Sequence, residues 1–193
     1  MKPVITSFYT EGTGYKQEAD RLRKSLEALD GVEWFIDSVP NLGSWEKNAS
    51  HKANFMRDML DKYQRPVVWV DADAVVHSYP ALFDEIEADI AAFYLTWKEG
   101  GQVVEGGLRS GTLYLEPTEA TDRLIKQWLE NNRTHPNVSF PQSNLHDAVE
   151  QTPDLRVYRL PREYCCIIGW AEHYHITAVV EHLQASRKFR GKV

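Results

Sequence analysis

Two aspartates separated by a single residue, Asp71 and Asp73, are the side chains of this sequence best placed to do chemistry. They follow an apolar run from Val67 to Val70, which is typical of a strand covered on both faces of a sheet. Because a carboxylate is costly to desolvate inside such a strand, we expect the chain to leave the sheet at Asp71. Open α/β sheets bind ligands at this end of their strands, and paired carboxylates there can hold a divalent cation, often with a phosphate-bearing substrate. The alternative is that both acids face solvent or cap the next turn.

Strand-like and helix-like segments alternate around this pair. Apolar spacing predicts strands at 4–9, 32–37, 67–70 and 90–95 and helices at 19–29, 47–62 and 81–88. The order βαβαβαβ predicts an α/β fold in which a mostly parallel central sheet is flanked by helices on both faces.

The second half of the chain has a different character. A glycine-bearing segment, 106–111, leads into a strand at 112–115, and its glycines either permit a bulge or let a ligand approach the backbone. Helices are expected at 118–131 and 142–150 and a strand at 155–160. The end of the chain places a histidine beside a basic cluster, 186–192.

Length and composition narrow the class of protein. A chain of 193 residues suits one domain, and a net charge of −6 disfavours a dedicated nucleic-acid binder. The sequence shows no secretory leader and no run long enough to span a membrane, so we expect a cytoplasmic protein. Cys165 and Cys166 are neighbours, which suits buried free thiols better than a disulfide or a zinc site.

Two weaker signals lie near the N-terminus. Gly12 and Gly14 form only a fragment of a dinucleotide-binding fingerprint, because Gln17 stands where the third glycine belongs, and a plain turn is the better interpretation. The loop at 38–48 is polar but carries Trp45, which allows it to face a substrate.

Several motifs taken together resemble those of the GT-A glycosyltransferases. They are the Asp-Ala-Asp after the buried strand, the segment 110–114 (Ser-Gly-Thr-Leu-Tyr), and the segment 181–188 (Glu-His-Leu-Gln-Ala-Ser-Arg-Lys). More narrowly, the chain looks like the small bacterial and phage nucleotide-diphospho-sugar transferases, with glycogenin-like enzymes as more distant relatives. The resemblance covers nearly the whole chain and implies one Rossmann-like GT-A domain. Residues 1–100 would form its nucleotide-binding half and 101–193 its acceptor-side half, with the metal and diphosphate segment at the end.

The resemblance implies a metal site made by Asp71, Asp73 and His182. The ion, manganese or magnesium, would neutralise the diphosphate that leaves when the glycosidic bond of a nucleotide sugar breaks. An imidazole beside two carboxylates suits manganese better than calcium. The alternative for His182 is an ordinary hydrogen-bonded histidine at a strand end.

The resemblance also implies a set of donor-binding residues. Tyr9 and Thr10 match the region that holds the nucleobase, and Arg187 and Lys188 could reach the diphosphate as a planar fork and a point charge. The full nucleotide-sugar set is Tyr9, Thr10, Asn48, Lys52, Asp71, Ser110, Gly111, Ser186, Arg187 and Lys188. Alternatives stay open: Tyr9 as a core residue, Lys52 on the outer face of its helix, and the basic run as a solvated tail or docking patch.

One position departs from the family pattern. Relatives tend to have Asp-Gln at the start of the helix on the acceptor side, whereas this chain has Pro141 before Gln142. Gln142 could still bind the donor sugar, and Asp147 or Glu105 would have to supply the missing carboxylate, so the predicted catalytic pair is Gln142 and Asp147. Both stereochemical outcomes stay open, with retention slightly favoured because it can lean on the leaving diphosphate itself.

The predicted function is transfer of a sugar from a nucleoside diphosphate donor, UDP favoured, to a hydroxyl of a glycan, protein, small molecule or modified DNA base. Two other functions fit the same residues. One is a phosphatase of the haloacid dehalogenase type, with Asp71 as nucleophile and Asp73 as acid and base. The other is a metal-dependent nucleotide-sugar binding module without catalysis. The sequence does not indicate an oligomeric state.

Overall fold

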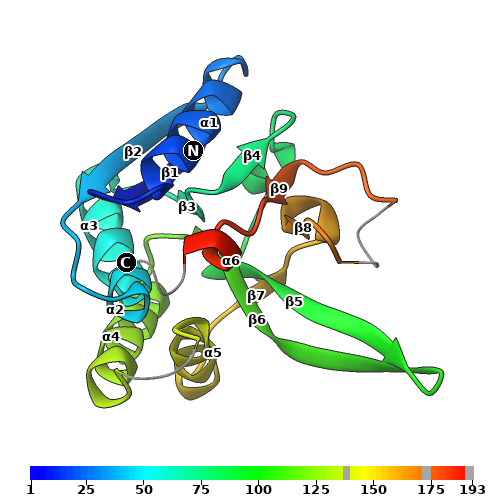
Figure 1. Ribbon diagram of the computed structural model, residues 1–193. Helices are drawn as coiled ribbons and strands as arrows, with labels where there is room; N and C mark the ends of the chain where they lie inside the picture. Colours follow the sequence, from blue (N-terminus) through cyan, green and yellow to red (C-terminus); the bar gives the residue numbers. More distant parts are fainter. Residues whose placement is uncertain (137–139, 171–174, 190–193) are drawn as a thin grey trace.

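The computed structural model describes residues 1–136, 140–170 and 175–189, and its centre is a six-stranded sheet (Figure 1). The strands are β1 (Val4–Thr10), β2 (Glu33–Val39), β3 (Val67–Val70), β5 (Ile90–Glu99), β6 (Gln102–Leu115) and β7 (Val157–Arg159). Their order is β2-β1-β3-β6-β5-β7, and all run in one direction except β6, which is antiparallel to both neighbours. The predicted mostly parallel α/β sheet is therefore confirmed.

A second, smaller sheet was not predicted. It consists of β4 (Ala74–Val76), β9 (Val180–His182) and β8 (Cys166–Ile167), in that order. These strands are only two or three residues long, which is too short for a periodic pattern to identify them. The sheet ties the C-terminal part of the chain to the segment directly after Asp73.

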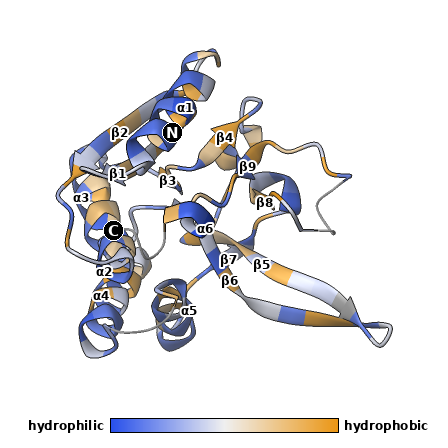
Figure 2. Ribbon diagram, viewed as in Figure 1, coloured by the Kyte–Doolittle hydropathy of each residue, from blue (hydrophilic) through white to orange (hydrophobic). Residues whose placement is uncertain are grey.

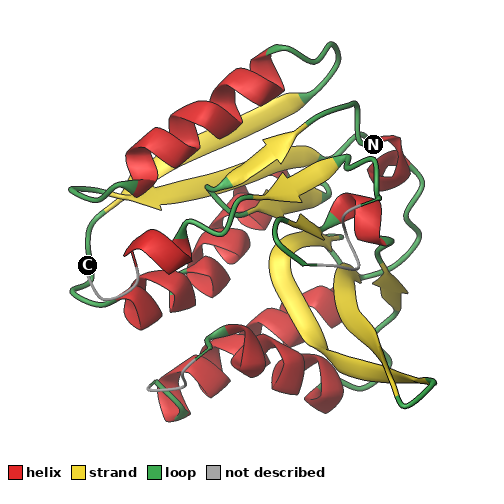
Figure 3. Ribbon diagram, turned by 45° about the vertical axis from the view of Figure 1, so that its right-hand side comes forward, coloured by secondary structure: helices red, strands yellow, loops and turns green. Residues whose placement is uncertain are grey.

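Helices cover both faces of the central sheet (Figure 3). They are α1 (Tyr15–Glu27), α2 (Trp45–Ser50), α3 (Lys52–Tyr63), α4 (Glu119–Thr134), α5 (Gln142–Gln151) and α6 (Ser186–Phe189). Helix α1 packs on one face together with the small sheet, and α3, α4 and α5 pack on the other. Along α1, Ala19, Leu22 and Leu26 are buried, as helical spacing predicts, and the helix carries both hydrophilic and hydrophobic residues along its length (Figure 2).

Two predicted helices need correction. The helix expected at 47–62 is two helices that meet at His51, and the first begins at Trp45, where the side chain of Ser44 accepts a hydrogen bond from the amide of Lys47. The helix expected at 81–88 is only a 3-10 turn, Ala81–Asp84. A buried tyrosine hydroxyl, that of Tyr164, accepts the amide of Leu82 and thereby holds this turn.

Strands β5 and β6 form a long hairpin that extends away from the rest of the protein (Figure 1). Gly100 and Gly101 turn the chain with positive φ angles of 57° and 83°. The pairing of β5 with β6 then slips: Phe93 pairs with Arg109, but Ala92 pairs with Leu113, so the residues between Arg109 and Leu113 have no partner in β5. The bulge that the glycines allowed is confirmed, and it lies beside the end of β3.

Two other predictions concern single features. Cys165 and Cys166 are both buried and free of disulfides, as expected. None of the helices in the described ranges combines the length and apolar character that crossing a membrane requires. Of the predicted basic cluster, residues 190–192 lie outside the described part of the chain.

Candidate functional site

A cavity of about 280 Å³ opens at the carboxyl ends of β1 and β3. Both aspartates of the Asp-x-Asp pair line it, together with residues from the C-terminal segment and from the bulge in β6. Its described lining is Phe8, Tyr9, Thr10, Tyr15, Trp45, Asn48, Ala49, Lys52, Trp69, Asp71, Ala72, Asp73, Arg109, Ser110, Gly111, Trp128, Phe140, Pro141, Gln142, Cys165, Ile167, Trp170, His182, Gln184 and Ser186. The predicted position, at the end of a buried strand in an open sheet, is where this cavity lies.

Asp71 is the first residue after β3, and its backbone still belongs to the sheet. Its amide donates to the carbonyl of Gly111 at 2.8 Å, and its own carbonyl accepts the amide of Ala74, which closes a turn. All four residues of β3 are buried, whereas the Asp71 side chain is 40 % exposed and faces the cavity. The chain therefore leaves the covered sheet where the carboxylate appears, as predicted.

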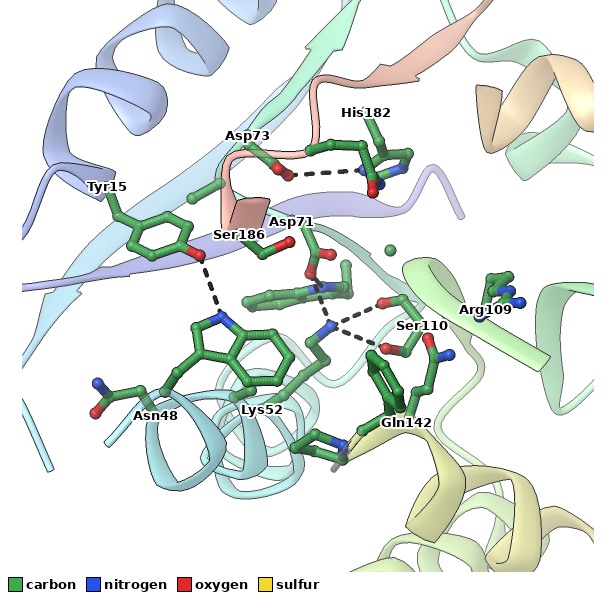
Figure 4. Close-up of a pocket in the computed structure, with 18 of the residues that line it drawn as sticks. Tyr15, Asn48, Lys52, Asp71, Asp73, Arg109, Ser110, Gln142, His182 and Ser186 are labelled. Carbon is green, nitrogen blue, oxygen red and sulfur yellow. Dashed lines mark hydrogen bonds and ion pairs between the residues drawn. The ribbon is translucent and has the colours of Figure 1, made fainter. Parts of the chain in front are cut away.

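One carboxylate oxygen of Asp71 is already held by protein donors (Figure 4). Oδ1 accepts from Lys52 Nζ at 2.7 Å and from Trp69 Nε1 at 2.8 Å. The same ammonium group of Lys52 also donates to the Ser110 carbonyl at 2.7 Å and lies 4.7 Å from the Trp69 ring centroid. Lys52 is buried, so the alternative that placed it on an outer helix face is wrong. These contacts fix the orientation of Asp71 and leave its other oxygen directed to the cavity.

The small sheet brings His182 to the aspartates. In the antiparallel pairing of β4 with β9, Ala74 lies opposite His182. Because Ala74 directly follows Asp73, this pairing places the histidine near the aspartate. Asp73 itself holds the chain after β9, because its carbonyl accepts the amide of Leu183 and its Oδ2 accepts the amide of Ala185 at 2.6 Å. The result is a compact group of Asp71, Asp73 and His182 whose potential ligand atoms all lie within 4.8 Å of one another.

The buried imidazole fits a metal ligand. His182 Nε2 lies 2.8 Å from Thr112 Oγ1, and its Nδ1 is buried without a hydrogen-bond partner among the described residues, 4.0 Å from Asp73 Oδ1. When Nε2 carries the proton and donates to Thr112, the lone pair of Nδ1 faces the two carboxylates, an arrangement typical of histidines that bind metals. Burial lowers the pKa of His182 to about 4, so the ring is neutral at pH 7. Burial and the negative charge of Asp71 raise the pKa of Asp73 to about 6. A bound cation would relieve the repulsion between the two carboxylates.

Gly111 gives the imidazole its space. A Cβ at this position would lie 2.9 Å from His182 Cε1 and 3.2 Å from both ring nitrogens. We expect Gly111→Ala to push the ring away from the aspartates and to weaken manganese binding by about 10 to 100-fold, the usual effect of disturbing the support of a ligand. Isothermal titration of the chelator-treated protein with manganese measures this change.

Gly107→Ala is the matched control, because a Cβ at Gly107 in the same strand meets no atom within 4 Å. Equal manganese affinity in the Gly111 and Gly107 variants would show that the position of the His182 ring does not govern metal binding.

Aromatic side chains form the end of the cavity nearest α1. Trp45 Nε1 donates to Tyr15 Oη at 3.2 Å, and the Tyr15 ring lies 5.2 Å from the Phe189 ring of α6. Gly14 makes room for that contact, because a Cβ there would lie 2.4 Å from Phe189 Cε1. The Gly12 and Gly14 segment is thus a turn that accepts an aromatic ring, and Trp45 does face the cavity. Tyr15 and Phe189 were not predicted, since nothing in the sequence links positions so far apart.

The predicted donor-binding residues fall into two groups. Tyr9, Thr10, Asn48, Lys52, Asp71, Ser110, Gly111 and Ser186 line the cavity. Arg187 and Lys188 are exposed side chains of α6 and are not part of the described lining. Asn48 has a second role, because its Oδ1 accepts the amide of Leu42 at 2.7 Å and its Nδ2 donates to Asn41 Oδ1, which holds the loop before α2.

The predicted catalytic pair is separated. Gln142, the first residue of α5, lines the cavity, whereas Asp147 is exposed and lies outside its lining. Five residues further along a helix correspond to about 140° of rotation, which turns Asp147 away from the face that carries Gln142. The other candidate, Glu105, is exposed on the hairpin and pairs with Arg159. Both acids therefore lie outside the described lining of the cavity that Gln142 enters, and the catalytic role of Asp147 stays a prediction.

Comparisons of the structure identify the fold. A glycosyltransferase involved in glycosylation of the major capsid of PBCV-1 superimposes with a TM-score of 0.69, at 14 % identity over 94 % of this chain and 93 % of that one. Mouse xyloside xylosyltransferase 1 gives 0.63, at 10 % identity over 96 % and 99 % of the two chains. The glycosyltransferase GlyE of Streptococcus pneumoniae TIGR4 gives 0.64, at 16 % identity, and this chain spans 55 % of its length. No family model matches the sequence, and no curated protein matches it. The chain has the GT-A glycosyltransferase fold, as the sequence motifs predicted.

Proposed function

We propose that this protein is a metal-dependent glycosyltransferase that moves a sugar from a nucleoside diphosphate sugar to a hydroxyl acceptor. The observation that carries the proposal is the convergence of Asp71, Asp73 and His182 in a cavity at the carboxyl ends of β1 and β3 in a GT-A fold. The fold alone does not establish an activity, because related scaffolds host many functions. The donor set of this site is what makes glycosyl transfer the best-supported function.

The proposed metal ligands are the free oxygen of Asp71, the carboxylate of Asp73 and Nδ1 of His182. Two oxygens and an imidazole nitrogen suit manganese, with magnesium as the second choice. When bound, such an ion would supply Lewis-acid stabilisation of the diphosphate leaving group, worth several kcal/mol. Thr112 fixes the histidine ring and Lys52 fixes Asp71, so the ligands are oriented before the ion arrives.

The rest of the cavity is proposed to orient the donor. Tyr9, Thr10, Tyr15 and Trp45 provide polar and aromatic surface for a nucleobase at one end, and Gln142 lies at the other end, where the sugar would extend. We favour a uracil base from the family resemblance. Ser186 lines the cavity beside these residues, and we assign the diphosphate to it, with Arg187 and Lys188, exposed on α6 outside the lining, added from the family resemblance.

The acceptor hydroxyl needs a proton acceptor, and the cavity offers few. Among its described lining residues the only carboxylates are Asp71 and Asp73, which are assigned to the metal. This supports a retaining reaction in which the hydroxyl oxygen bonds to the anomeric carbon as the bond to the diphosphate breaks. The proton then passes to an oxygen of the leaving diphosphate, which serves as the base.

The two rival functions predict other results. A haloacid dehalogenase-type phosphatase is not favoured, because the third member of the acid cluster is a histidine and the structural neighbours are glycosyltransferases. A binding module without catalysis would bind the same donor and leave it intact. Nucleotide-sugar turnover therefore separates a transferase from a binding module, and Asp71-dependent hydrolysis of general phosphoesters would favour the phosphatase.

A thermal-shift panel tests the proposal. Nucleoside diphosphates and their sugars are added with manganese or with chelator, and one of them is expected to raise Tm by roughly 5 to 10 °C when present at about 100 times its Kd. The shift should require manganese, because Asp71 and Asp73 would otherwise repel the diphosphate, and the positive charge of an ion held by them would offset that repulsion. Absence of a manganese-dependent shift with every nucleotide would reject the proposed function.

A further inference from the structure

Arg109 lines the cavity but belongs neither to the proposed metal ligands nor to the proposed nucleotide-binding residues. It lies on the opposite side of Asp71 from Tyr15 and Asn48, close to Ser110 and above Gln142 (Figure 4). The bulge in β6 begins at this residue, and after it residues 113–115 pair with β5 on one side and with β3 on the other. Bulges beside active sites commonly redirect side chains in this way.

The guanidinium group of Arg109 has no anionic partner among the described residues. Its Nε is buried without a hydrogen-bond partner among the described residues, and the Trp170 ring centroid lies 5.3 Å from its Cζ. The other buried cation of the cavity, Lys52, is fully engaged with Asp71 and Ser110. Burial lowers the pKa of Arg109, but a guanidinium group stays charged at neutral pH. A half-buried cation with no anionic partner in the described part of the chain costs free energy unless a ligand supplies the counter-charge.

The surroundings of Arg109 suit a sugar. The Trp170 ring lies beside the guanidinium group, and Phe140, which is 54 % exposed, also lines the cavity. Gln142 adds an amide that can both donate and accept hydrogen bonds. Apolar ring faces with a few polar groups are the usual lining of a site that orients a small polar ligand.

We propose that Arg109 recognises an acidic group, a carboxylate or a phosphate, on a saccharide substrate of this enzyme. The inference rests on the proposed function, because it places the acidic group on the sugar that is transferred or on the acceptor sugar. Arg109 lies on one side of Asp71, and Ser186 and Tyr15 lie on the other (Figure 4). We assign the nucleotide diphosphate to the side of Ser186 and Tyr15. A planar guanidinium fork matches the two oxygens of a carboxylate or phosphate.

Matched ligand pairs that differ only in the acidic group test this inference. In the donor arm, UDP-glucuronate is compared with UDP-glucose, and UDP-galacturonate with UDP-galactose, by isothermal titration with manganese. In the acceptor arm, glucose 6-phosphate and glucuronate are compared with glucose, and galacturonate with galactose, by saturation-transfer NMR, with and without UDP. We expect the parent protein to prefer the acidic member in one arm by about 10 to 100-fold, the range for hydrogen bonds to charged groups. The arm that shows the preference identifies the substrate that carries the charge.

The variants are Arg109→Gln, which removes the charge, and Arg109→Lys, which keeps it without the fork. Arg57→Gln, on the exposed surface of α3, is the control. The inference holds if Arg109→Gln abolishes the preference while UDP affinity changes less than twofold. It is overturned if the parent shows no preference in either arm, if the preference survives Arg109→Gln, or if UDP affinity falls as much as that of the acidic ligand. Failure of every nucleotide in the thermal-shift panel to bind the parent protein rejects the proposed function instead, and the acceptor arm without nucleotide still decides the role of Arg109.

Discussion

Asp73→Asn is expected to abolish manganese-dependent binding of the donor and to lower kcat/KM by about 10³-fold or more, because Lewis-acid stabilisation of the leaving group is worth several kcal/mol. The asparagine has nearly the same shape, and its amide oxygen can still accept the hydrogen bond from the backbone of Ala185. The fold should therefore survive while the metal loses a charged ligand. Manganese titration and donor hydrolysis in the same preparation measure both effects.

The same variant is expected to be more stable than the parent when metal is removed by chelator. Burial and Asp71 raise the pKa of Asp73 to about 6, so the folded state binds this proton more tightly than the unfolded chain, where the pKa is about 3.8. Ionisation of the Asp73 carboxyl group then destabilises the folded state. This destabilisation is complete well above pH 6 and absent below about pH 4. Asp73→Asn should raise the free energy of unfolding by about 3 kcal/mol at pH 8, and the gain should vanish as pH falls to 4.

Asp61→Asn, at an exposed position of α3, is the control for a general effect of charge. If Asp73→Asn still hydrolyses the donor, the assignment of Asp73 as a metal ligand is wrong. Loss of stability at pH 8 in the presence of chelator would instead mean that the hydrogen bond to Ala185 outweighs the repulsion from Asp71.

The parts of the site that follow from local patterns were predictable. A run of apolar residues predicts a buried strand, and two acids directly after it indicate where the covered sheet ends. The positions of β3, Asp71 and Asp73 could therefore be derived from the local sequence pattern. The likeness to the GT-A enzymes added His182, whose place beside the aspartates depends on the pairing of β4 with β9. That pairing joins segments more than a hundred residues apart through strands of three residues, and periodicity carries no such information.

What the sequence could not supply was the direction of β6 and the residues that its bulge presents. A strand from 112 to 115 was predicted, but the antiparallel hairpin with β5 begins at Gln102. Once the hairpin is in place, the slip after Arg109 turns its guanidinium group into the cavity beside Trp170. The departure at Pro141 was visible in the sequence, whereas the position of Asp147, exposed on α5 and outside the cavity lining, became apparent only from the structure.

Lys52→Met is expected to affect stability and donor binding together. The ammonium group donates to Asp71 Oδ1 and to the Ser110 carbonyl, so its removal leaves two acceptors poorly satisfied in a largely buried place. Because Asp71 is 40 % exposed, water can replace part of the loss, and we expect the free energy of unfolding to fall by about 2 kcal/mol. Loss of a cation beside the diphosphate should weaken UDP binding by about 10 to 100-fold. Urea denaturation with chelator and titration with UDP and manganese provide the two measurements.

Two further variants separate the charge of Lys52 from its geometry. Lys52→Arg keeps the charge, but a planar guanidinium group cannot point donors at Asp71 and Ser110 as an ammonium group does, so we expect it to restore stability only in part. Lys24→Met, on the exposed surface of α1, controls for the loss of a lysine elsewhere. Parent-like stability and UDP affinity in Lys52→Met would mean that Trp69 alone holds Asp71. The Lys52 ammonium group repels a metal ion but attracts a diphosphate. The affinity for manganese alone should therefore fall less in Lys52→Met than the affinity for UDP does. This difference would identify Lys52 as a residue that contacts the donor.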